Sequence, residues 1–205
     1  MSLYVTRHGE TDYNVKDLVC GISEAKLTEK GIEQANRLAH SLQKINYKYL
    51  YVSPLQRAID TAKYADIHNL NFIVEPRLKE INFGKYEGVR RKCKEFLSNK
   101  NNLAYRYPGG ESFIELCKRV YGFLDEIKEQ ATSADVLLVC HGAVCRAIHS
   151  YFNDMTNEEI FYFQTDNCEL LKYEYWFSEF IIRLKLGRGI YLRVLRGGWL
   201  LLQCH

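Results

Sequence analysis

Long apolar runs, internal repeats and nucleotide-binding motifs are all missing from this chain of 205 residues. No stretch reaches the ~18 consecutive apolar residues of a membrane-spanning helix, so we expect none. No segment recurs at a period of about 20 to 50 residues, which excludes solenoids and propellers. Neither a GxGxxG nor a Walker pattern occurs, and we therefore expect no nucleotide cofactor.

A large excess of one charge is missing as well, since 28 basic and 25 acidic residues leave a net charge of +3. This balance does not indicate nucleic acid as a partner, because the basic residues are not clustered either. The seven cysteines are an odd number, and the apolar stretch from Met1 to Val5 is too short for a secretory signal. We therefore expect a cytoplasmic protein with free thiols.

The combined cysteine and histidine spacing of a zinc site is also missing. Cys140, Cys145, His141 and His149 lie close together in the sequence, but they do not form the usual pattern of ligand pairs. We therefore expect no bound metal ion.

Apolar residues are plentiful, at 47% of the chain beside 26% charged residues, and they suffice for a well-packed core. Strand-like and helix-like segments alternate, which indicates an α/β protein: a three-layer α/β/α sandwich with a mostly parallel central sheet. The predicted strands are 3–6, 49–52, 72–74 and 136–140. The predicted helices are 28–45, 53–68, 112–130 and 142–152.

Two of the predicted helix starts carry capping signals. Ser53 is followed by Pro54 and Gln56, which predicts a serine cap, a proline in the first turn and a glutamine in the capping box. Ser112 and Glu115 show the same capping-box spacing. We expect both serines to act as helix caps.

Polar side chains follow three of the predicted strands. Arg7 and His8 follow the first, Arg57 lies in the turn after the second, and His141 and Gly142 follow the strand 136–140. Ligands of parallel sheets bind beyond these strand ends, so we expect the groups to meet. Arginine presents a planar fork to phosphate oxygens, and a neutral imidazole can attack phosphorus. The set therefore suits transfer of a phosphoryl group.

Phosphoryl transfer to water also requires a proton donor for the leaving alkoxide. A carboxylic acid that is partly removed from solvent can supply that proton. Glu80 and Glu87, in the loop expected between residues 76 and 88, are the two candidates.

Five short motifs occur between residue 3 and about residue 172. They are TRHGET (6–11) with Asn14, SPLQRA (53–58) with TA (61–62), LKEINFG (78–84) with EG (87–88), PGGES (108–112) and CHG (140–142). In this order they resemble the motifs of the histidine phosphatase superfamily, which has the phosphoglycerate mutase-like fold. An Arg-His-Gly triplet alone arises by chance, whereas five motifs in order are specific.

The resemblance implies a role for each matched position. His8 corresponds to the histidine that becomes phosphorylated, and Glu80 to the acid that protonates the leaving group and then activates water. Glu80 is thereby favoured over Glu87. No metal or other cofactor is implied, because the cations are built into the pocket. The rest of that phosphate pocket corresponds to Arg7, Asn14, Arg57, His141 and Gly142.

The matched region also leaves some contacts open. Cys20 precedes Gly21 where relatives usually place an amide or hydroxyl residue, so substrate contacts there are undecided. Glu111 is a possible substrate contact, and the basic run 90–94 is interpreted as a solvated face. Selectivity is expected to lie in the loops between residues 84 and 110.

We expect a phosphomonoester hydrolase that acts on a small phosphorylated metabolite, as a monomer or homodimer. Phosphoglycerate mutase is the nearest alternative, but mutase relatives tend to carry a longer insertion than the 61 positions from Glu80 to His141. The compact chain resembles small phosphatases such as alpha-ribazole phosphatase and broad-specificity phosphatases. A non-catalytic phosphate-binding module is the alternative from another class, and the joint presence of His8, Arg57, Glu80 and His141 disfavours it.

The last thirty residues differ from the rest in composition. They contain both tryptophans, five basic residues and one acidic residue, a net charge of +4, while residues 1–175 carry −1. We therefore expect a histidine phosphatase domain over 1–175 and a hydrophobic, basic tail over 176–205, interpreted as accessory or non-native. Membrane association is disfavoured, because a helical plot mixes arginines among leucines instead of placing them on separate faces, and because four glycines would weaken a helix.

Overall fold

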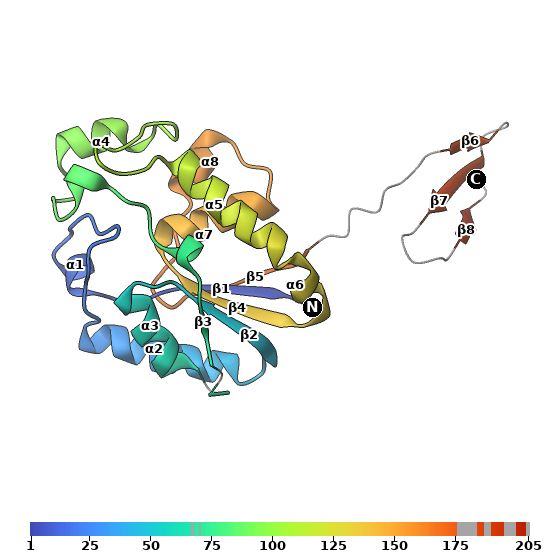
Figure 1. Cartoon of the computed structure of the whole chain (residues 1–205), viewed down its shortest axis with the longest axis horizontal. Coiled ribbons are helices and arrows are strands. Elements are labelled where there is room, and N and C mark those ends of the chain that lie inside the picture. The colour runs from blue at the N-terminus through green and yellow to red at the C-terminus, as the bar shows by residue number, and fades with distance from the viewer. Residues whose placement is uncertain (67, 70, 176–183, 187–189, 195–199, 204–205) are drawn as a thin grey trace. The chain divides into compact units, whose positions relative to one another are not determined.

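The computed structural model describes residues 1–66, 68–69, 71–175, 184–186, 190–194 and 200–203 (Figure 1). Two units are distinguished, Met1–Tyr175 and Trp176–His205. The candidate site lies in the first unit. In the described part of the chain, no helix is long and apolar enough to cross a membrane.

The second unit contains a small antiparallel sheet. Its described strands are β6 (Leu184–Leu186), β7 (Ile190–Val194) and β8 (Leu200–Gln203), paired in the order β6-β7-β8. Residues 176–183 of the predicted hydrophobic, basic tail lie outside the described residues, as do its four glycines at 187, 189, 197 and 198.

A five-stranded sheet forms the centre of the first unit. Its strands are β1 (Leu3–Arg7), β2 (Tyr47–Val52), β3 (Ile73–Val74), β4 (Asp135–Cys140) and β5 (Leu170–Tyr173), in the order β3-β2-β4-β1-β5. Strands β1 to β4 pair in parallel, and β5 pairs antiparallel with β1 at the edge. The predicted mostly parallel sheet is confirmed. The edge strand β5 was not predicted, because its four residues carry no clear alternation of apolar and polar side chains.

Helices cover both faces of this sheet (Figure 1). Helices α2 (Glu29–Leu42) and α3 (Gln56–Ala65) lie on one face; α5 (Phe113–Glu126), α6 (Lys128–Ser133), α7 (Gly142–Phe152) and α8 (Asn157–Tyr162) lie on the other. Strand β4 shows why the sheet has a layer of helices on each face. Val136 and Leu138 pack into the α5–α7 core, while Leu137 and Val139 pack into the α2–α3 core. Since successive strand residues point to opposite faces, a fully apolar strand needs a cover on each.

Short elements occupy the connections that follow the strands. They are α1 (Asp12–Val15), η1 (Pro76–Leu78), η2 (Gly84–Tyr86) and α4 (Lys94–Lys100). None of them was predicted, because a single turn leaves little periodicity in the sequence. In Figure 1, α1 and α4 lie on the side where β1 and β4 end. The connections therefore surround the carboxyl ends of the strands.

The predicted cap at Ser53 is wrong. Its backbone N–H continues the sheet by donating to the Val139 carbonyl over 3.0 Å, and the residue before helix α3 is Leu55, which makes no side-chain cap. Ser53 thus directly follows the last residue of β2 and does not cap α3. The helix ends at Ala65, earlier than expected, because Asp66 is extended.

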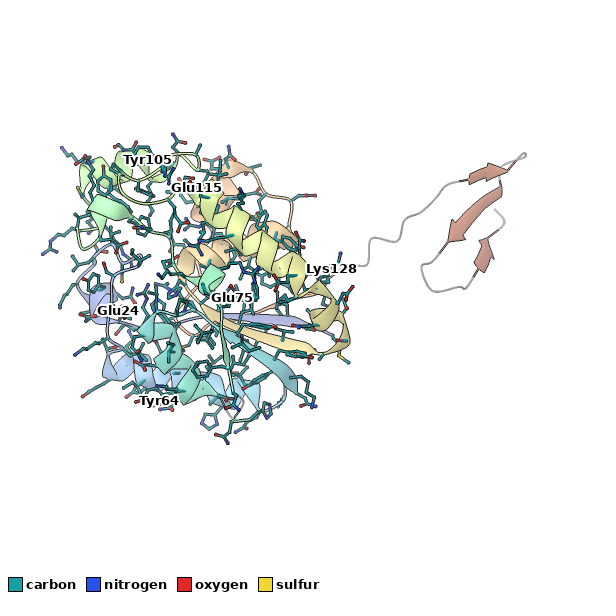
Figure 2. All side chains as sticks on the ribbon, viewed as in Figure 1. Glu24, Tyr64, Glu75, Tyr105, Glu115 and Lys128 are labelled. Atoms are coloured by element: carbon teal, nitrogen blue, oxygen red, sulfur yellow. The ribbon has the colours of Figure 1, made fainter. Side chains whose placement is uncertain are left out.

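The second capping box is confirmed. The Ser112 hydroxyl accepts from the Glu115 N–H, and the Glu115 carboxylate accepts from the Ser112 N–H over 2.8 Å. Glu115 is labelled at the start of this helix in Figure 2. The expected single helix to residue 130 is divided, because Ile127 has non-helical backbone angles between α5 and α6.

Candidate active site

His8 and His141 come together because β1 and β4 are parallel neighbours. Arg7 is opposite Cys140 in the strand register, and the His8 N–H donates to the Cys140 carbonyl over 3.0 Å. The residue that follows each of these two strands is a histidine, so the register places His8 beside His141. The centroids of the two imidazole rings lie 5.2 Å apart, and His8 and His141 are 5% and 0% exposed.

The neighbours of His8 determine which ring nitrogen carries its proton. Nδ1 lies 2.7 Å from the Gly9 carbonyl, which can only accept, so Nδ1 carries the hydrogen. Nε2 accepts a hydrogen bond of 3.2 Å from Nε of Arg57, which can only donate. Nε2 therefore carries the lone pair, and it is the atom able to attack a phosphorus.

The surroundings also keep this imidazole uncharged. Burial, followed by the positive charges of Arg57 and Arg7, lowers the pKa of His8 well below its usual value. The pKa of His141 is lowered in the same way by burial, Arg57 and His8. Both rings are therefore neutral at pH 7, the state that a nucleophile requires.

All three guanidinium nitrogens of Arg57 form hydrogen bonds. Its remaining guanidinium nitrogens donate to backbone carbonyls, Nη1 to Ser23 over 2.8 Å and Nη2 to Gly21 over 2.6 Å. The side chain is fully buried. Arg57 thus fixes a positive charge against His8 by means of the loop 21–23.

Glu87 organises that loop. Its carboxylate accepts five hydrogen bonds, three of them from the consecutive backbone N–H groups of Gly21, Ile22 and Ser23. The other two come from the Ser23 hydroxyl and the Phe83 N–H, at 2.7 and 3.1 Å. With so many donors around it, this carboxylate serves as an acceptor that shapes the loop.

Glu80, the other candidate acid, lies beside the start of α7. Its Oε1 accepts from the Ile81 N–H over 2.9 Å, and its Oε2 accepts from the Ala143 N–H over 3.2 Å. A side chain at Gly142 would lie 3.7 Å from Arg7 Nε and 3.9 Å from Glu80 Oε2, so these groups are adjacent. Glu80 is 7% exposed. Its carboxyl group is largely shielded from solvent and lies beside Gly142, the residue after His141, which suits a proton donor.

An ion pair supports the backbone of Glu80. Arg119 pairs with Glu111 at 2.7 Å, and it donates to the Arg77 carbonyl over 2.6 Å and to the Glu80 carbonyl over 3.2 Å. Glu111 also accepts from the Asn82 N–H over 3.0 Å. Glu111, left open as a substrate contact, therefore binds the segment that carries Glu80.

Three buried polar atoms lack a hydrogen-bond partner in the described part of the chain. They are Arg7 Nε, His141 Nδ1 and Thr165 Oγ1. All belong to this site, since Arg7 Nη1 donates to the Thr165 carbonyl over 2.8 Å and His141 faces His8. Buried polar groups are normally paired. Three unpaired ones together indicate a place for a polar ligand.

The proton of His141 is placed by Ser53. The two side chains approach to 2.6 Å at His141 Nε2, and the Ser53 oxygen already accepts from the Leu55 N–H. Ser53 can then donate its hydroxyl proton to Nε2, which leaves the His141 proton on the unpartnered Nδ1. This nitrogen is a donor available to an oxyanion.

A pocket of about 190 Å³ opens from the site. Arg7, Glu80, Gly142 and Thr165 line it, whereas His8, Arg57 and His141 are buried and do not line it. Its other walls are Val19, Cys20, Phe83, Arg91, Phe96, Lys100, Ala143, Arg146, Phe163 and Gln164. Cys20, where the motif departs from that of relatives, faces this pocket as a neutral thiol, because burial raises its pKa to about 11.

Asn14 forms part of a helix start. Its Oδ1 accepts from the backbone and the hydroxyl of Thr11, both over 3.0 Å, as the capping box of α1. This contact gives Asn14 a structural role; a phosphate contact stays a prediction.

Cys140, Cys145 and His149, which were considered as zinc ligands, make packing contacts. The sulfurs of Cys140 and Cys145 lie 3.6 Å apart, and both thiols are free and buried. The His149 ring stacks on Phe163 at 3.9 Å. Within the described residues, no group of three or more His, Cys, Asp or Glu side chains is arranged for a metal ion.

Sequence reasoning did not assign several residues to the site. Ser53 was mistaken for a helix cap, and Thr165 and Asn167 lie in a segment without a motif. Asn167 donates from its amide to the His8 carbonyl over 2.7 Å. Arg146 lies five positions after His141 on α7, and this spacing from a motif histidine was the signal that could have identified it.

Comparison with known proteins gives a family and a range of activities. The model of the histidine phosphatase superfamily (branch 1) matches residues 3–185. "Putative phosphoserine phosphatase 2" of Hydrogenobacter thermophilus is 32% identical over 174 residues, covering 81% of this chain and 85% of that protein. "Probable phosphoglycerate mutase GpmB" of Yersinia pestis is 30% identical and covers 85% of each chain.

Solved structures agree in fold. The alpha-ribazole phosphatase of Shigella flexneri superimposes with a TM-score of 0.74 at 28% identity, covering 84% of this chain and 89% of that one. Phosphatases and a mutase are thus both among the similar proteins. The matched residues end at 185, ten positions beyond the first structural unit.

Proposed function

Because the chain belongs to the histidine phosphatase superfamily, we propose that it hydrolyses phosphomonoesters through a phosphohistidine on His8, without a metal ion. One observation carries this proposal. A buried, neutral His8 presents the lone pair of Nε2 beside Arg57, and two unpartnered donors, Arg7 Nε and His141 Nδ1, belong to the same site. This is an arrangement for a nucleophile and a phosphate group.

In the first step, Arg57 Nε–H turns from His8 Nε2 to a phosphate oxygen, and the freed lone pair of Nε2 attacks the phosphorus. The Nε2–P bond forms, the ester P–O bond breaks, and the leaving alkoxide takes a proton from Glu80. The Nδ1 hydrogen keeps its bond to the Gly9 carbonyl, which stabilises the positive charge that the ring acquires. Glu80 is left as a carboxylate.

In the second step, water replaces the histidine. Glu80 accepts a proton from that water, whose oxygen forms a new bond to phosphorus while the Nε2–P bond breaks. Inorganic phosphate leaves, and His8 and Glu80 return to their starting states. Splitting the hydrolysis in this way replaces one difficult step by two easier ones.

The charge on the transferring group is neutralised by the protein. In phosphoryl transfer this charge is spread over three equatorial oxygens. Arg7, Arg57, His141 and the N-terminus of α7 at Gly142 supply donors at the site. Built-in cations of this kind take the place of a metal ion in the proposal.

Transfer of the phosphoryl group between two hydroxyls is the second candidate, since a mutase is among the similar proteins. The compact spacing of 61 positions between Glu80 and His141 favours hydrolysis. The physiological substrate is proposed to be a small phosphorylated metabolite. The cytoplasm is proposed as the location, because the six described cysteines are free.

Turnover of p-nitrophenyl phosphate, beside isomerisation of 3-phosphoglycerate, tests the proposal. We expect release of p-nitrophenol, unchanged after treatment with EDTA, and little isomerisation. Faster isomerisation than hydrolysis would make the protein a mutase. No turnover of either compound would favour a phosphate-binding module. Loss of activity with EDTA and recovery with a divalent metal would contradict the metal-free mechanism.

A further inference from the structure

Three cations line the pocket in addition to the groups of the proposed phosphate site. They are Arg91, Lys100 on α4 and Arg146 on α7, and we call them the cation trio. Glu80 is the one carboxylate among the lining residues. The pocket therefore joins the proposed phosphate site to a second positively charged region.

The cation trio makes no direct ion pair in the described part of the chain, although Glu80 acts on Arg146 and Asp17 acts on Lys100 at longer range. No described carboxylate forms an ion pair with any of the three. Arg119 and Arg77, which are partly buried like Arg146, each pair with glutamates. Lys100 and Arg146 are partly buried, whereas Arg91 is exposed. Partly buried cations are normally paired, so the two unpaired ones indicate a missing anion.

Backbone contacts hold the two arginines while leaving most of their donors unused. Arg146 donates from Nε to the Phe163 carbonyl over 3.2 Å, and Arg91 donates from Nε to the Leu18 carbonyl over 3.0 Å. Each guanidinium carries four further N–H groups on its terminal nitrogens. These groups are the ones that bind a carboxylate or a phosphate in a bidentate manner.

The two arginines act on Lys100. Burial, then Arg146 and then Arg91, lowers the pKa of Lys100, and Asp17 opposes them. Burial also lowers the pKa of Arg146, and Glu80 opposes this effect. The arginines are thus close enough to repel Lys100, and a bound anion would relieve that repulsion.

Aromatic side chains form part of the remaining wall. Phe83 packs edge to face against Phe96 with ring centroids 5.4 Å apart, and Phe163 is stacked on His149. Lys100 lies over the Phe161 ring at 5.3 Å. A volume of about 190 Å³ is below the roughly 300 Å³ at which pockets for drug-sized ligands begin. The pocket therefore suits a short carbon chain.

We propose that the cation trio is a second anion site, which selects short phosphomonoesters that carry a carboxylate or a second phosphate group. This selection rests on the proposed function, because the first phosphate occupies the site of Arg7, His8 and His141. An ester with no second anion would leave the partly buried Lys100 and Arg146 unpaired in the pocket. Arg146 and Lys100 are then specificity-determining residues.

Binding of three matched phosphonates tests the proposal without relying on hydrolysis. Propylphosphonate has one anionic group, 3-phosphonopropionate adds a carboxylate, and propane-1,3-bisphosphonate adds a second phosphonate. Titration calorimetry of the full chain at constant ionic strength gives the three dissociation constants. We expect at least one doubly anionic compound to bind about tenfold more tightly than propylphosphonate, as for a charge-assisted hydrogen bond. The tighter of the two identifies carboxylate or phosphate.

Variants connect this preference to the trio. Arg146→Gln and Lys100→Met should each reduce the preference to about threefold or less, which is the loss of about half or more of the tenfold gain in binding free energy. Arg90→Gln is the matched control, because Arg90 is exposed and lies outside the pocket lining. It should keep the preference of the unaltered protein. Circular dichroism checks folding, and Lys100→Met decides the matter if Arg146→Gln does not fold.

Two results would overturn the second anion site. One is equal affinity of the unaltered protein for all three phosphonates. The other is an equal loss of preference in Arg90→Gln, which would reduce the effect to general charge attraction. Absence of p-nitrophenyl phosphate turnover with the preference intact would instead contradict only the hydrolase function.

Discussion

Nε of Arg57 donates a hydrogen bond of 3.2 Å to Nε2 of His8, while the other two guanidinium nitrogens of Arg57 are held by the Gly21 and Ser23 carbonyls. This relationship orients the lone pair of the proposed nucleophile and keeps the ring neutral. It also connects His8 to Glu87, because Glu87 shapes the loop that holds Arg57.

Replacement of His8 by alanine should remove turnover, because Nε2 is the proposed phosphoryl acceptor. Brief reaction with a phosphate-labelled ester, stopped in alkali to preserve phosphohistidine, should place the label on His8 in the unaltered protein. His40→Ala is the matched control, since His40 is exposed on α2. Label on another residue, or full labelling of His8→Ala, would refute the assignment.

Replacing Glu80 should slow turnover by an amount that depends on the leaving group, whereas replacing Glu87 should not. Glu80→Gln should slow an alkyl phosphate by about 10²-fold to 10⁴-fold, and p-nitrophenyl phosphate far less, because p-nitrophenolate needs little protonation. Glu87→Gln should slow both esters alike, since it loosens the loop that holds Arg57. Steady-state kcat for the two esters measures this. An equal loss of both esters in Glu80→Gln would make Glu80 a structural residue.

Arg119 should act as a positioning residue for Glu80. Arg119→Met releases the Arg77 and Glu80 carbonyls and leaves Glu111 without its partner. We expect kcat for an alkyl phosphate to fall by about 10-fold to 10²-fold, as for a small misplacement of a reacting group. Turnover of p-nitrophenyl phosphate should fall less.

The neighbouring Lys118→Met provides a control for Arg119, because Lys118 is exposed on the same helix. It should leave both rates unchanged. A uniform fall of both esters in Arg119→Met would indicate a general loss of structure instead of a displaced acid.

Stability should decrease as the pH falls below about 6.5, the usual pKa of histidine. The folded pKa values of His8 and His141 are lowered, so below that pH the unfolded chain binds protons that the folded chain excludes. Each histidine then contributes a loss of up to about 1.4 kcal/mol per pH unit. Urea unfolding between pH 7 and 5.5 measures the slope, which should be shallower in His141→Asn. An unchanged slope would mean that His141 is protonated in the folded state.

Truncation after Tyr175 should leave hydrolysis of p-nitrophenyl phosphate within a few-fold, because the site lies within Met1–Tyr175. Tyr175 must be kept, since its buried hydroxyl donates to the Leu124 carbonyl over 2.9 Å. A second truncation after residue 185, where the family match ends, is the comparison. Loss of turnover in a folded chain of 175 residues, with full turnover at 185, would move the domain boundary.

The sequence by itself determined the elements whose signals are local. The apolar strand β4, the periodic helix α2 and the Ser112–Glu115 capping box each depend on residues within a few turns of one another, and the motif order pointed to the family. The alternation of these elements was enough to predict a doubly covered, mostly parallel sheet.

Only the tertiary structure decided what the polar side chains do. Ser53 and His141 are 88 positions apart, and Glu80 and Ala143 are 63 positions apart. Their contacts depend on the strand order β3-β2-β4-β1-β5, which no local pattern contains. The same holds for Glu87, which accepts four of its five hydrogen bonds from residues 64 to 66 positions away. It also holds for the cation trio, whose members come from a loop, α4 and α7. A carboxylate or a guanidinium has the same local signature whether it supports a backbone or faces a substrate, and the partners that folding brings to it make the difference.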